Sequence, residues 1–245
     1  MKKLLTILFL SLQLFADDLV VGTTSGYAPF VSLNPQGKYE GFDIDIAELV
    51  AQKLGRKLVL KDLGSMPSLM LALKQKKVDV LIWAISITKE RQKNLDMVYY
   101  QGDKVVKMPF LFWDKAPAIE SMEELAKDPK KVICVEAGSF QEEALKKVPG
   151  ISLKYIDKIT DAVMEIKMGK SFATLIDPSL VAKFKTQYPN IRVLNLPLPP
   201  SSQSLGNGIC INKTNTKLSA EVRKAIDELT TEGKIAELEK KWGLR

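Results

Sequence analysis

Residues 79–91, DVLIWAISITKER, decide the organisation of this chain of 245 residues. Val80 to Ala84 form a continuous apolar run after one acid, which is typical of a strand buried on both faces of a parallel sheet. Ser86 falls where such a strand would end. Thr88 is suited to cap a following helix, and Arg91 would then lie in the first turn of that helix.

The position of Arg91 indicates a binding site for a small acid. Ligands of open α/β sheets bind just outside the carboxyl ends of the strands. A guanidinium group presents a planar fork of donors that matches a carboxylate with two bonds. The alternative interpretation is a buried strand followed by the solvated basic start of a helix.

The composition is that of a globular protein and excludes several classes of function. Apolar residues make up 46% and charged residues 27% of the chain. The formal net charge of +7 is dispersed, and no basic block interleaved with aromatic residues supports nucleic-acid binding. The chain contains no His, which excludes Ser-His-Asp and Cys-His chemistry and most zinc sites. We expect no cofactor and no metal.

Residues 1–16 have the pattern of a secretory signal peptide. Lys2 and Lys3 precede an apolar core from Leu4 to Phe15, and Ala16 is the expected last residue before cleavage. The segment is too short for a membrane span, and an uncleaved anchor is the alternative. Because no Cys follows it, we expect no lipid attachment and an exported protein that is free in the periplasm.

The two cysteines, Cys134 and Cys210, both lie in apolar, strand-like runs. An oxidising compartment permits a disulfide between them, and two separate buried thiols are the alternative.

From residue 19 onward, apolar strand-like runs alternate with amphipathic helical segments. The expected strands cover residues 19–23, 58–61, 79–84, 104–113, 132–136, 153–156, 172–177, 192–196 and 208–211. The expected helices cover residues 42–54, 67–75, 120–126, 141–148, 161–168 and 234–242, with further helices beginning at 178 and 219. The first β-α-β-α-β run implies a parallel sheet.

One α/β unit thus occurs twice, which predicts an α/β fold with two lobes. We expect the chain to cross between them near residues 105 and 205. The predicted boundaries are 17–107 with 205–245 for one lobe and 108–204 for the other.

Five segments carry a resemblance to a known family, in this order: GTTSGYAPF, GKYEGFDIDIAELVAQKLG, LKQKKVDVLIWAISITKER, VEAGSFQEEAL and GKIAELEKKWG. Together they resemble the polar amino-acid-binding proteins of bacterial ABC importers. The resemblance covers essentially the whole chain after the signal. It implies the two-lobed periplasmic-binding-protein-like fold of type two, with two hinge strands.

The resemblance also implies how the α-groups of a free amino acid are held. Arg91 matches the residue that binds the α-carboxylate, with the Ser86 hydroxyl beside it and the Ala84 carbonyl facing the ammonium. Asp177 matches the acid of the other lobe that pairs with the ammonium, although it is equally placed to cap the helix begun by Pro178. A strand-to-helix turn adds backbone N–H groups to the carboxylate site: Gly138, Ser139 and Phe140.

The positions that line the side-chain pocket in the family are occupied here by Tyr27, Met66, Trp83, Glu136 and Thr24. Tyr27 and Trp83 offer flat surfaces for an alkyl chain or a guanidinium group. Glu136 is an acid at the end of a strand, and a buried carboxylate needs a counter-charge. Thr24 stands where some relatives that bind basic amino acids have an Asp, so no second acid is expected there. Core filling by Trp83 and a solvent-facing Glu136 are the alternatives.

We therefore expect a non-enzymatic, monomeric binding protein that delivers arginine, or else lysine or ornithine, to the membrane subunits of an importer. Three alternatives stay open. One is a binder of a neutral polar amino acid such as glutamine. Another is an exported enzyme similar to cyclohexadienyl dehydratases, for which Glu136 is the candidate acid or base. The third is a sensor or adhesin role for the same lobes.

Overall fold

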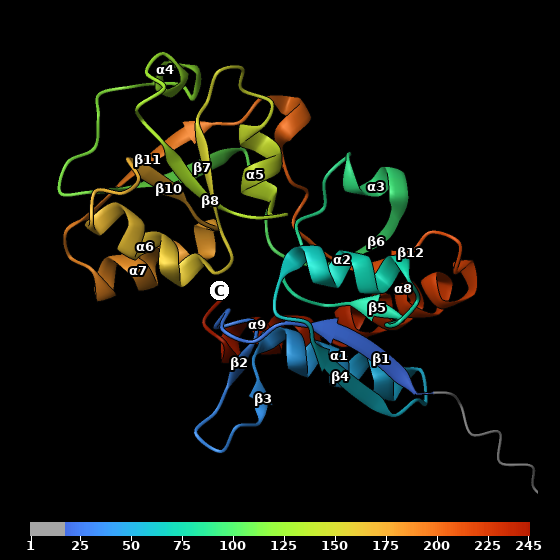
Figure 1. Cartoon of the computed structure of the whole chain (residues 1–245). Coiled ribbons are helices and arrows are strands. Elements are labelled where there is room, and N and C mark those ends of the chain that lie inside the picture. The colour runs from blue at the N-terminus through green and yellow to red at the C-terminus, as the bar shows by residue number, and fades with distance from the viewer. Residues whose placement is uncertain (1–17) are drawn as a thin grey trace, which may run out of the picture.

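Two separate β-sheets, each covered by helices, form the core of the computed structural model, which describes residues 18–245 (Figure 1). The sheet of lobe 1 contains strands from both ends of the chain, and the sheet of lobe 2 contains only strands from the middle. The predicted signal peptide lies outside the described residues. No helix within residues 18–245 is long and apolar enough to cross a membrane.

Lobe 1 has a five-stranded sheet in the order β4 (Leu58–Asp62), β1 (Leu19–Thr23), β5 (Val80–Leu81), β12 (Asn207–Asn212) and β6 (Leu95–Gln101). Its helices are α1 (Phe42–Lys53), α2 (Met66–Lys74), α3 (Arg91–Asn94), α8 (Thr216–Thr231) and α9 (Lys234–Lys241). A small hairpin of β2 (Ser32–Leu33) and β3 (Tyr39–Glu40) precedes α1.

Lobe 2 has a second five-stranded sheet in the order β11 (Ile191–Pro197), β7 (Lys107–Trp113), β10 (Ala173–Leu175), β8 (Ile133–Glu136) and β9 (Leu153–Ile156). Its helices are α4 (Glu123–Ala126), α5 (Phe140–Leu145), α6 (Ile159–Lys167) and α7 (Val181–Gln187). Two short 3-10 helices complete it, η1 (Pro178–Leu180) and η2 (Pro200–Ser202).

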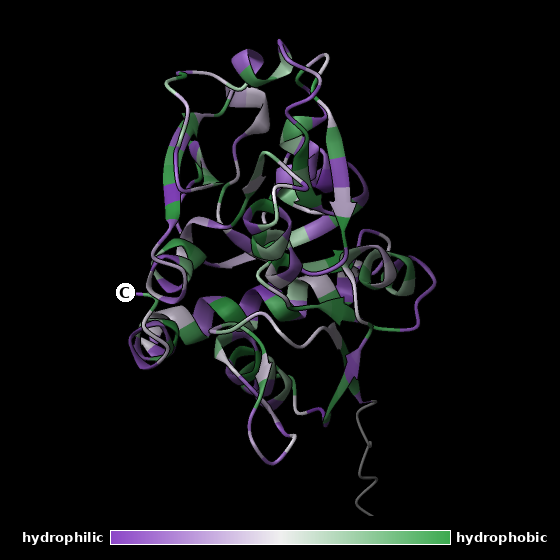
Figure 2. Cartoon of the chain, turned by 60° about the vertical axis from the view of Figure 1, so that its left-hand side comes forward, coloured by the Kyte–Doolittle hydropathy of each residue, from purple (hydrophilic) through white to green (hydrophobic). Residues whose placement is uncertain are grey.

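Alternation along the strands of lobe 2 separates two hydrophobic clusters on the two faces of its sheet. Phe110 and Phe112 of β7 belong to one cluster, and Leu111 between them belongs to the other. Successive side chains of a strand point to opposite faces, so both faces of this sheet are buried under helices. Figure 2 shows the matching pattern, in which the helices alternate between hydrophobic and hydrophilic residues.

The parallel arrangement expected at the start of the chain is confirmed, because β1 pairs in parallel with both β4 and β5. The sheet is nevertheless mixed, since β12 runs antiparallel to β5 and to β6. The strand β6 was not predicted. Its sequence, LDMVYYQ, mixes charged and apolar residues, and its pairing partner lies more than a hundred residues further along the chain.

The strand predicted for residues 79–84 is shorter than expected, and this part of the prediction is wrong. Regular pairing ends at Leu81, and antiparallel pairing resumes only at Ser86, which forms an isolated bridge with Asn207 at the start of β12. Ala84 has a positive φ of 43°, a left-handed conformation that is incompatible with a strand. All residues from Val80 to Thr88 are nonetheless buried, so the apolar run correctly indicated burial.

The two chain segments near residues 105 and 205 lie side by side where the chain passes between the lobes. Val105 and Ser204 form an antiparallel bridge, and the Val105 N–H donates to the Ser204 carbonyl at 3.0 Å. On the lobe 1 side of this bridge, the side-chain amide of Asn207 donates to Gln101 at 2.8 Å.

Cys134 and Cys210 are both buried and both free. They belong to different hydrophobic clusters, Cys134 in lobe 2 and Cys210 in lobe 1. Of the two alternatives left open by the sequence, the structure shows two separate buried thiols.

Candidate functional site

Arg91 connects the two lobes. Its side chain is 10% exposed, and its Nη1 donates to the Ser86 carbonyl at 2.9 Å. Its Nη2 donates across the interface to the Gly138 carbonyl at 3.0 Å. Burial lowers the pKa of the guanidinium group, which still keeps its charge at neutral pH. Thr88 accepts a hydrogen bond from the Arg91 N–H at 3.1 Å, as expected for a capping residue.

The turn from Gly138 to Phe140 meets lobe 1 at the N-terminus of α2. Ser139 caps α5, and its hydroxyl accepts from the Glu142 N–H at 3.1 Å. Gly138 has a φ of 74°, and a Cβ atom at this position would lie 3.1 Å from Cγ of Met66. A side chain at residue 138 would therefore be strained by its backbone and crowded by the facing lobe. Met66 therefore lies at the interface between the lobes, and its role in lining the side-chain pocket stays a prediction.

Tyr27 and Trp83 form an aromatic pair in lobe 1. Their ring centroids are 5.4 Å apart, and Tyr27 also stacks on Phe30 at 5.6 Å. Tyr27 packs against hydrophobic clusters of both lobes, which places it at the interface. Trp83 is only 5% exposed, and its Nε1 has no hydrogen-bond partner among the described residues.

Lobe 2 contributes two acids on the side of Tyr27. Burial raises the pKa of the Tyr27 hydroxyl well above its usual value, and the carboxylates of Asp177, Glu136 and Asp43 raise it further. Burial also raises the pKa of Glu136 to about 7. Within residues 18–245, no basic side chain forms an ion pair with Glu136, so its charge is uncompensated.

Asp177 caps the short helix η1. Its Oδ1 accepts from the Ser179 N–H at 2.8 Å and from the Ser179 hydroxyl. Burial raises its pKa, and the bonds from Ser179 lower it. Asp177 also lines a cavity of about 480 Å³ together with the hinge residues Gln101 and Asn207. Asp177 is thus a helix cap, which is one of the two roles that the sequence left open. The same residue also lines this cavity between the lobes.

Thr24 is the predicted site residue that the structure connects to a different group. It is buried, and its hydroxyl donates to Asp62 at 2.9 Å. Asp62 also accepts from the Ser25 N–H at 2.9 Å and from the Tyr39 hydroxyl at 3.2 Å. The end of β4 therefore supplies an acid beside Thr24, where none was expected. Asp62 was not among the predicted site residues.

Glu143 was also missed. Its Oε2 accepts from the Thr88 hydroxyl at 3.1 Å and lies 3.8 Å from Nε of Arg91. Glu143 belongs to α5 of lobe 2, whereas Thr88 and Arg91 belong to lobe 1. The pairing joins residues about fifty positions apart, so no local pattern in the sequence could have indicated it.

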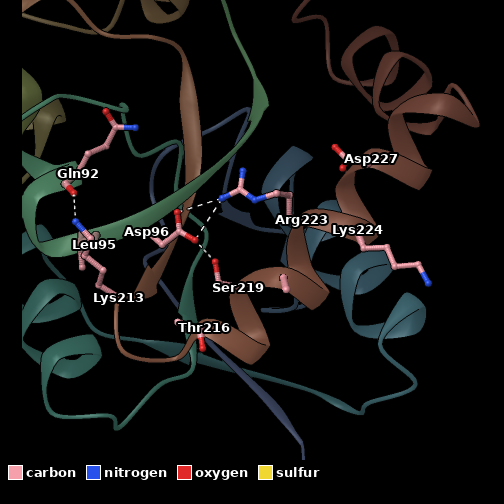
Figure 3. Close-up of a pocket in the computed structure, with 10 residues that line it drawn as sticks. Gln92, Leu95, Asp96, Lys213, Thr216, Ser219, Arg223, Lys224 and Asp227 are labelled. Atoms are coloured by element: carbon pink, nitrogen blue, oxygen red, sulfur yellow. Dashed lines mark hydrogen bonds and ion pairs between the residues drawn. The ribbon is translucent and has the colours of Figure 1, made fainter.

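A cavity of about 730 Å³ lies elsewhere, on lobe 1 beside β6 and α8 (Figure 3). Asp96 of β6 accepts hydrogen bonds there from Ser219 and from Arg223, the latter at 3.1 Å. The residues that line it include none of the predicted site residues.

Arg91 thus bonds to carbonyls of both lobes, and Tyr27 packs against hydrophobic clusters of both, which is the architecture of a binding protein of two α/β lobes. Residues 19–245 match the family described as "Bacterial extracellular solute-binding proteins, family 3". The chain belongs to this family.

Two curated relatives match this chain in sequence over most of their length. The "Probable ABC transporter arginine-binding protein ArtJ" of Chlamydia trachomatis is 30% identical over 229 residues, which is 94% of this chain and 87% of that protein. The "Arginine-binding extracellular protein ArtP" of Bacillus subtilis is 28% identical over 91% of this chain and 85% of that protein.

Three solved structures are similar in fold. An ancestral arginine-binding protein bound to arginine has a TM-score of 0.79 and 28% identity, covering 93% of this chain and 99% of that one. An ancestral arginine-binding protein bound to glutamine has a TM-score of 0.78 and 29% identity, covering 92% of this chain and 97% of that one. The ancestral amino-acid-binding protein AncCDT-1, a precursor of cyclohexadienyl dehydratase, has a TM-score of 0.76 and 26% identity, covering 92% of this chain and 94% of that one.

Glu143→Gln should weaken ligand binding by loosening the contact between the lobes. Loss of charge-assisted bonds to Thr88 and Arg91 removes about 1 kcal/mol, so the dissociation constant should rise roughly fivefold, mainly through faster release. The ratio of affinities for two different ligands should not change. Stopped-flow kinetics and calorimetry measure these quantities.

Glu165→Gln is the matched control, because Glu165 pairs with Lys154 inside lobe 2 at 2.6 Å. Tighter binding by Glu143→Gln would contradict the prediction and would mean that Glu143 competes with the ligand for Arg91.

Proposed function

We propose that this protein captures a free amino acid, with arginine preferred, between its two lobes and delivers it to the membrane subunits of an ABC importer. The observation that supports arginine most directly is Glu136. Burial raises the pKa of its carboxylate to about 7, and no basic side chain of the described residues pairs with it. A guanidinium group supplies the missing charge.

The α-groups of the ligand would bind at the two ends of the site. Arg91 would bind the α-carboxylate, which would replace the Gly138 carbonyl as acceptor for Nη2. The Ser86 hydroxyl and the N–H groups of the turn from Gly138 to Phe140 would add to this end. The Ala84 carbonyl and Asp177 would bind the ammonium. Each lobe then holds one charge of the zwitterion.

The ligand side chain would lie between Tyr27 and Trp83, with Met66 beside it and Glu136 at its end. The aliphatic stem of arginine fits the aromatic faces, and its guanidinium also stacks favourably on such rings. Lysine and ornithine share the charge but not the planar group, so they rank below arginine.

The sheets support the division into residues 17–107 with 205–245 and residues 108–204 as the two lobes. All strands of lobe 1 lie in the first set, and the strands of lobe 2 lie in the second except for the first residue of β7. We infer that the paired segments at Val105 and Ser204 form the hinge. Closure would exclude water and strengthen the pairs with the ligand.

A glutamine-like ligand is the second candidate, and Trp83 is the observation that favours it. Its buried Nε1–H lacks an acceptor within residues 18–245, and the carbonyl of a side-chain amide would supply one. For the dehydratase alternative, the family description points to solute binding rather than to catalysis.

We also propose that the protein is exported and that its signal is removed after Ala16. The mature protein is then a monomer in the periplasm. The description of the family as extracellular supports export. Mass spectrometry of the purified protein and of its copurifying ligand tests these points together with the identity of the amino acid.

Arg91→Ala should abolish binding of every accepted amino acid, because all of them share the α-carboxylate. Removal of one partner of a buried charge pair costs on the order of 3–5 kcal/mol, or more than 100-fold in affinity. Asp177→Asn should act in the same direction through the ammonium. Arg223→Ala is the matched control, since Arg223 pairs with Asp96 away from the interface. Near-native calorimetric affinity of a folded Arg91→Ala would remove Arg91 from the site.

Glu136→Gln should reduce the preference for arginine over its uncharged isostere citrulline. A hydrogen bond to a charged group contributes about 1.5–3 kcal/mol, so the wild type should prefer arginine roughly tenfold or more. Four dissociation constants, two ligands against two proteins, give the coupling as a double-mutant cycle. Equal binding of citrulline and arginine by the wild type would refute the role of Glu136.

Arginine affinity should increase with pH between about 5.5 and 7.5. In the free protein Glu136 is protonated below its pKa of about 7, and a bound guanidinium favours the ionised form. Binding below that pKa therefore releases a proton, so affinity falls by up to about tenfold for each pH unit of acidification. Calorimetry in two buffers of different ionisation enthalpy counts the proton. Glu136→Gln should lose most of this dependence, and an unchanged profile would contradict the assignment.

A further inference from the structure

Asp43 is a fully buried carboxylate that has no direct role in the proposed ligand site. It is 0% exposed and lies in the first turn of α1. Its Oδ2 accepts from the Ala84 N–H at 2.6 Å, and its Oδ1 accepts from the Tyr100 hydroxyl at 2.7 Å. An acid buried this completely is costly, so its two short bonds and the positive end of α1 are what keep it in place.

The bond from Ala84 lies in residues 82–86, the binding segment, which the proposed function places against the ligand. Ala84 is one of three non-glycine residues with a positive φ among those described, and it carries the carbonyl proposed to face the ligand ammonium. A left-handed conformation is unfavourable for an alanine, because its Cβ atom crowds the backbone. Asp43 offsets this cost by accepting the N–H group that the conformation turns inward.

The bond from Tyr100 connects the same carboxylate to the hinge. Tyr100 lies on β6, which ends at Gln101 just before the chain crosses to lobe 2. Its ring stacks on Phe42 at 6.0 Å, so its hydroxyl is held firmly. One carboxylate therefore joins the start of α1, the binding segment and the strand that leads into the hinge.

We propose that Asp43 is a positioning residue for ligand binding: it holds Ala84 in the left-handed conformation that presents Trp83, the Ala84 carbonyl and Ser86 to the interface. The proposal rests on the proposed function, because it takes this segment to be the one that binds the ligand. Asp43 determines affinity through the backbone of residues 82–86 and not by touching the ligand.

The test compares Asp43→Leu, which removes both acceptors, with Asp79→Leu. Asp79 is the matched control because its Oδ2 also accepts a backbone N–H in lobe 1, that of Val20 at 2.8 Å. Both variants should lose stability in thermal unfolding. Only Asp43→Leu should lose arginine affinity in calorimetry, by at least tenfold. Equal losses of affinity, or none with Asp43→Leu, would overturn the proposal.

Ala84→Gly supplies a rescue that a merely structural role of Asp43 would not show. Glycine adopts positive φ at no steric cost, so the segment should depend less on Asp43 in this background. Asp43→Leu should then cost several-fold less affinity than it does beside Ala84. If Asp43→Leu does not fold, Asp43→Asn keeps one acceptor and should show the same pattern with a smaller loss. An identical loss in both backgrounds would contradict the proposal.

Trp83 provides a readout that needs no ligand, so failure of this proposal is distinguishable from failure of the proposed function. Trp113→Phe and Trp242→Phe leave Trp83 as the sole tryptophan of the chain. Acrylamide quenching of the free protein should increase at least twofold on adding Asp43→Leu and stay unchanged on adding Asp79→Leu. Unchanged quenching in both would show that the segment keeps its conformation without Asp43.

Discussion

One guanidinium group bonds directly to both lobes. Arg91 donates to the Ser86 carbonyl in its own lobe and to the Gly138 carbonyl in the other, and a buried cation needs both acceptors. Gly138 reaches this position because it has no side chain to meet Met66. Arg91 is also the residue best suited to a carboxylate, so the group that joins the lobes is the group that a ligand would engage.

The charges at the interface are distributed unequally between the lobes. Lobe 1 supplies Arg91, and lobe 2 supplies Asp177 and Glu136, whose pKa values are both raised by burial. In the proposed site, a free amino acid would offset Arg91 and Asp177, and Glu143 already lies beside Arg91. Glu136 would then remain as an unpaired acid, which would favour a basic amino acid over a neutral one. Trp83, with its buried N–H, would distinguish the two in the opposite direction.

Local patterns predicted much of the fold. The apolar runs located all five strands of lobe 2, and the Thr88 hydroxyl accepts a hydrogen bond at the start of α3, as its residue type indicates. The sequence failed where a partner lies far away along the chain. β6 is a strand because β12 pairs with it, and beyond the end of β5 the Ala84 N–H donates to Asp43 and not to a neighbouring strand.

The sequence by itself determined the family, the order of the elements and the residue types available for the site, since these follow from periodicity and from short motifs. Only the tertiary structure decided which of those residues meet. It brought Tyr27 near Asp177 and Glu136, Arg91 to Gly138, Glu143 to Thr88, and Thr24 to Asp62. The reason is physical: burial of a charge and the partner that compensates it depend on distance in space, and separation along the chain does not specify that distance.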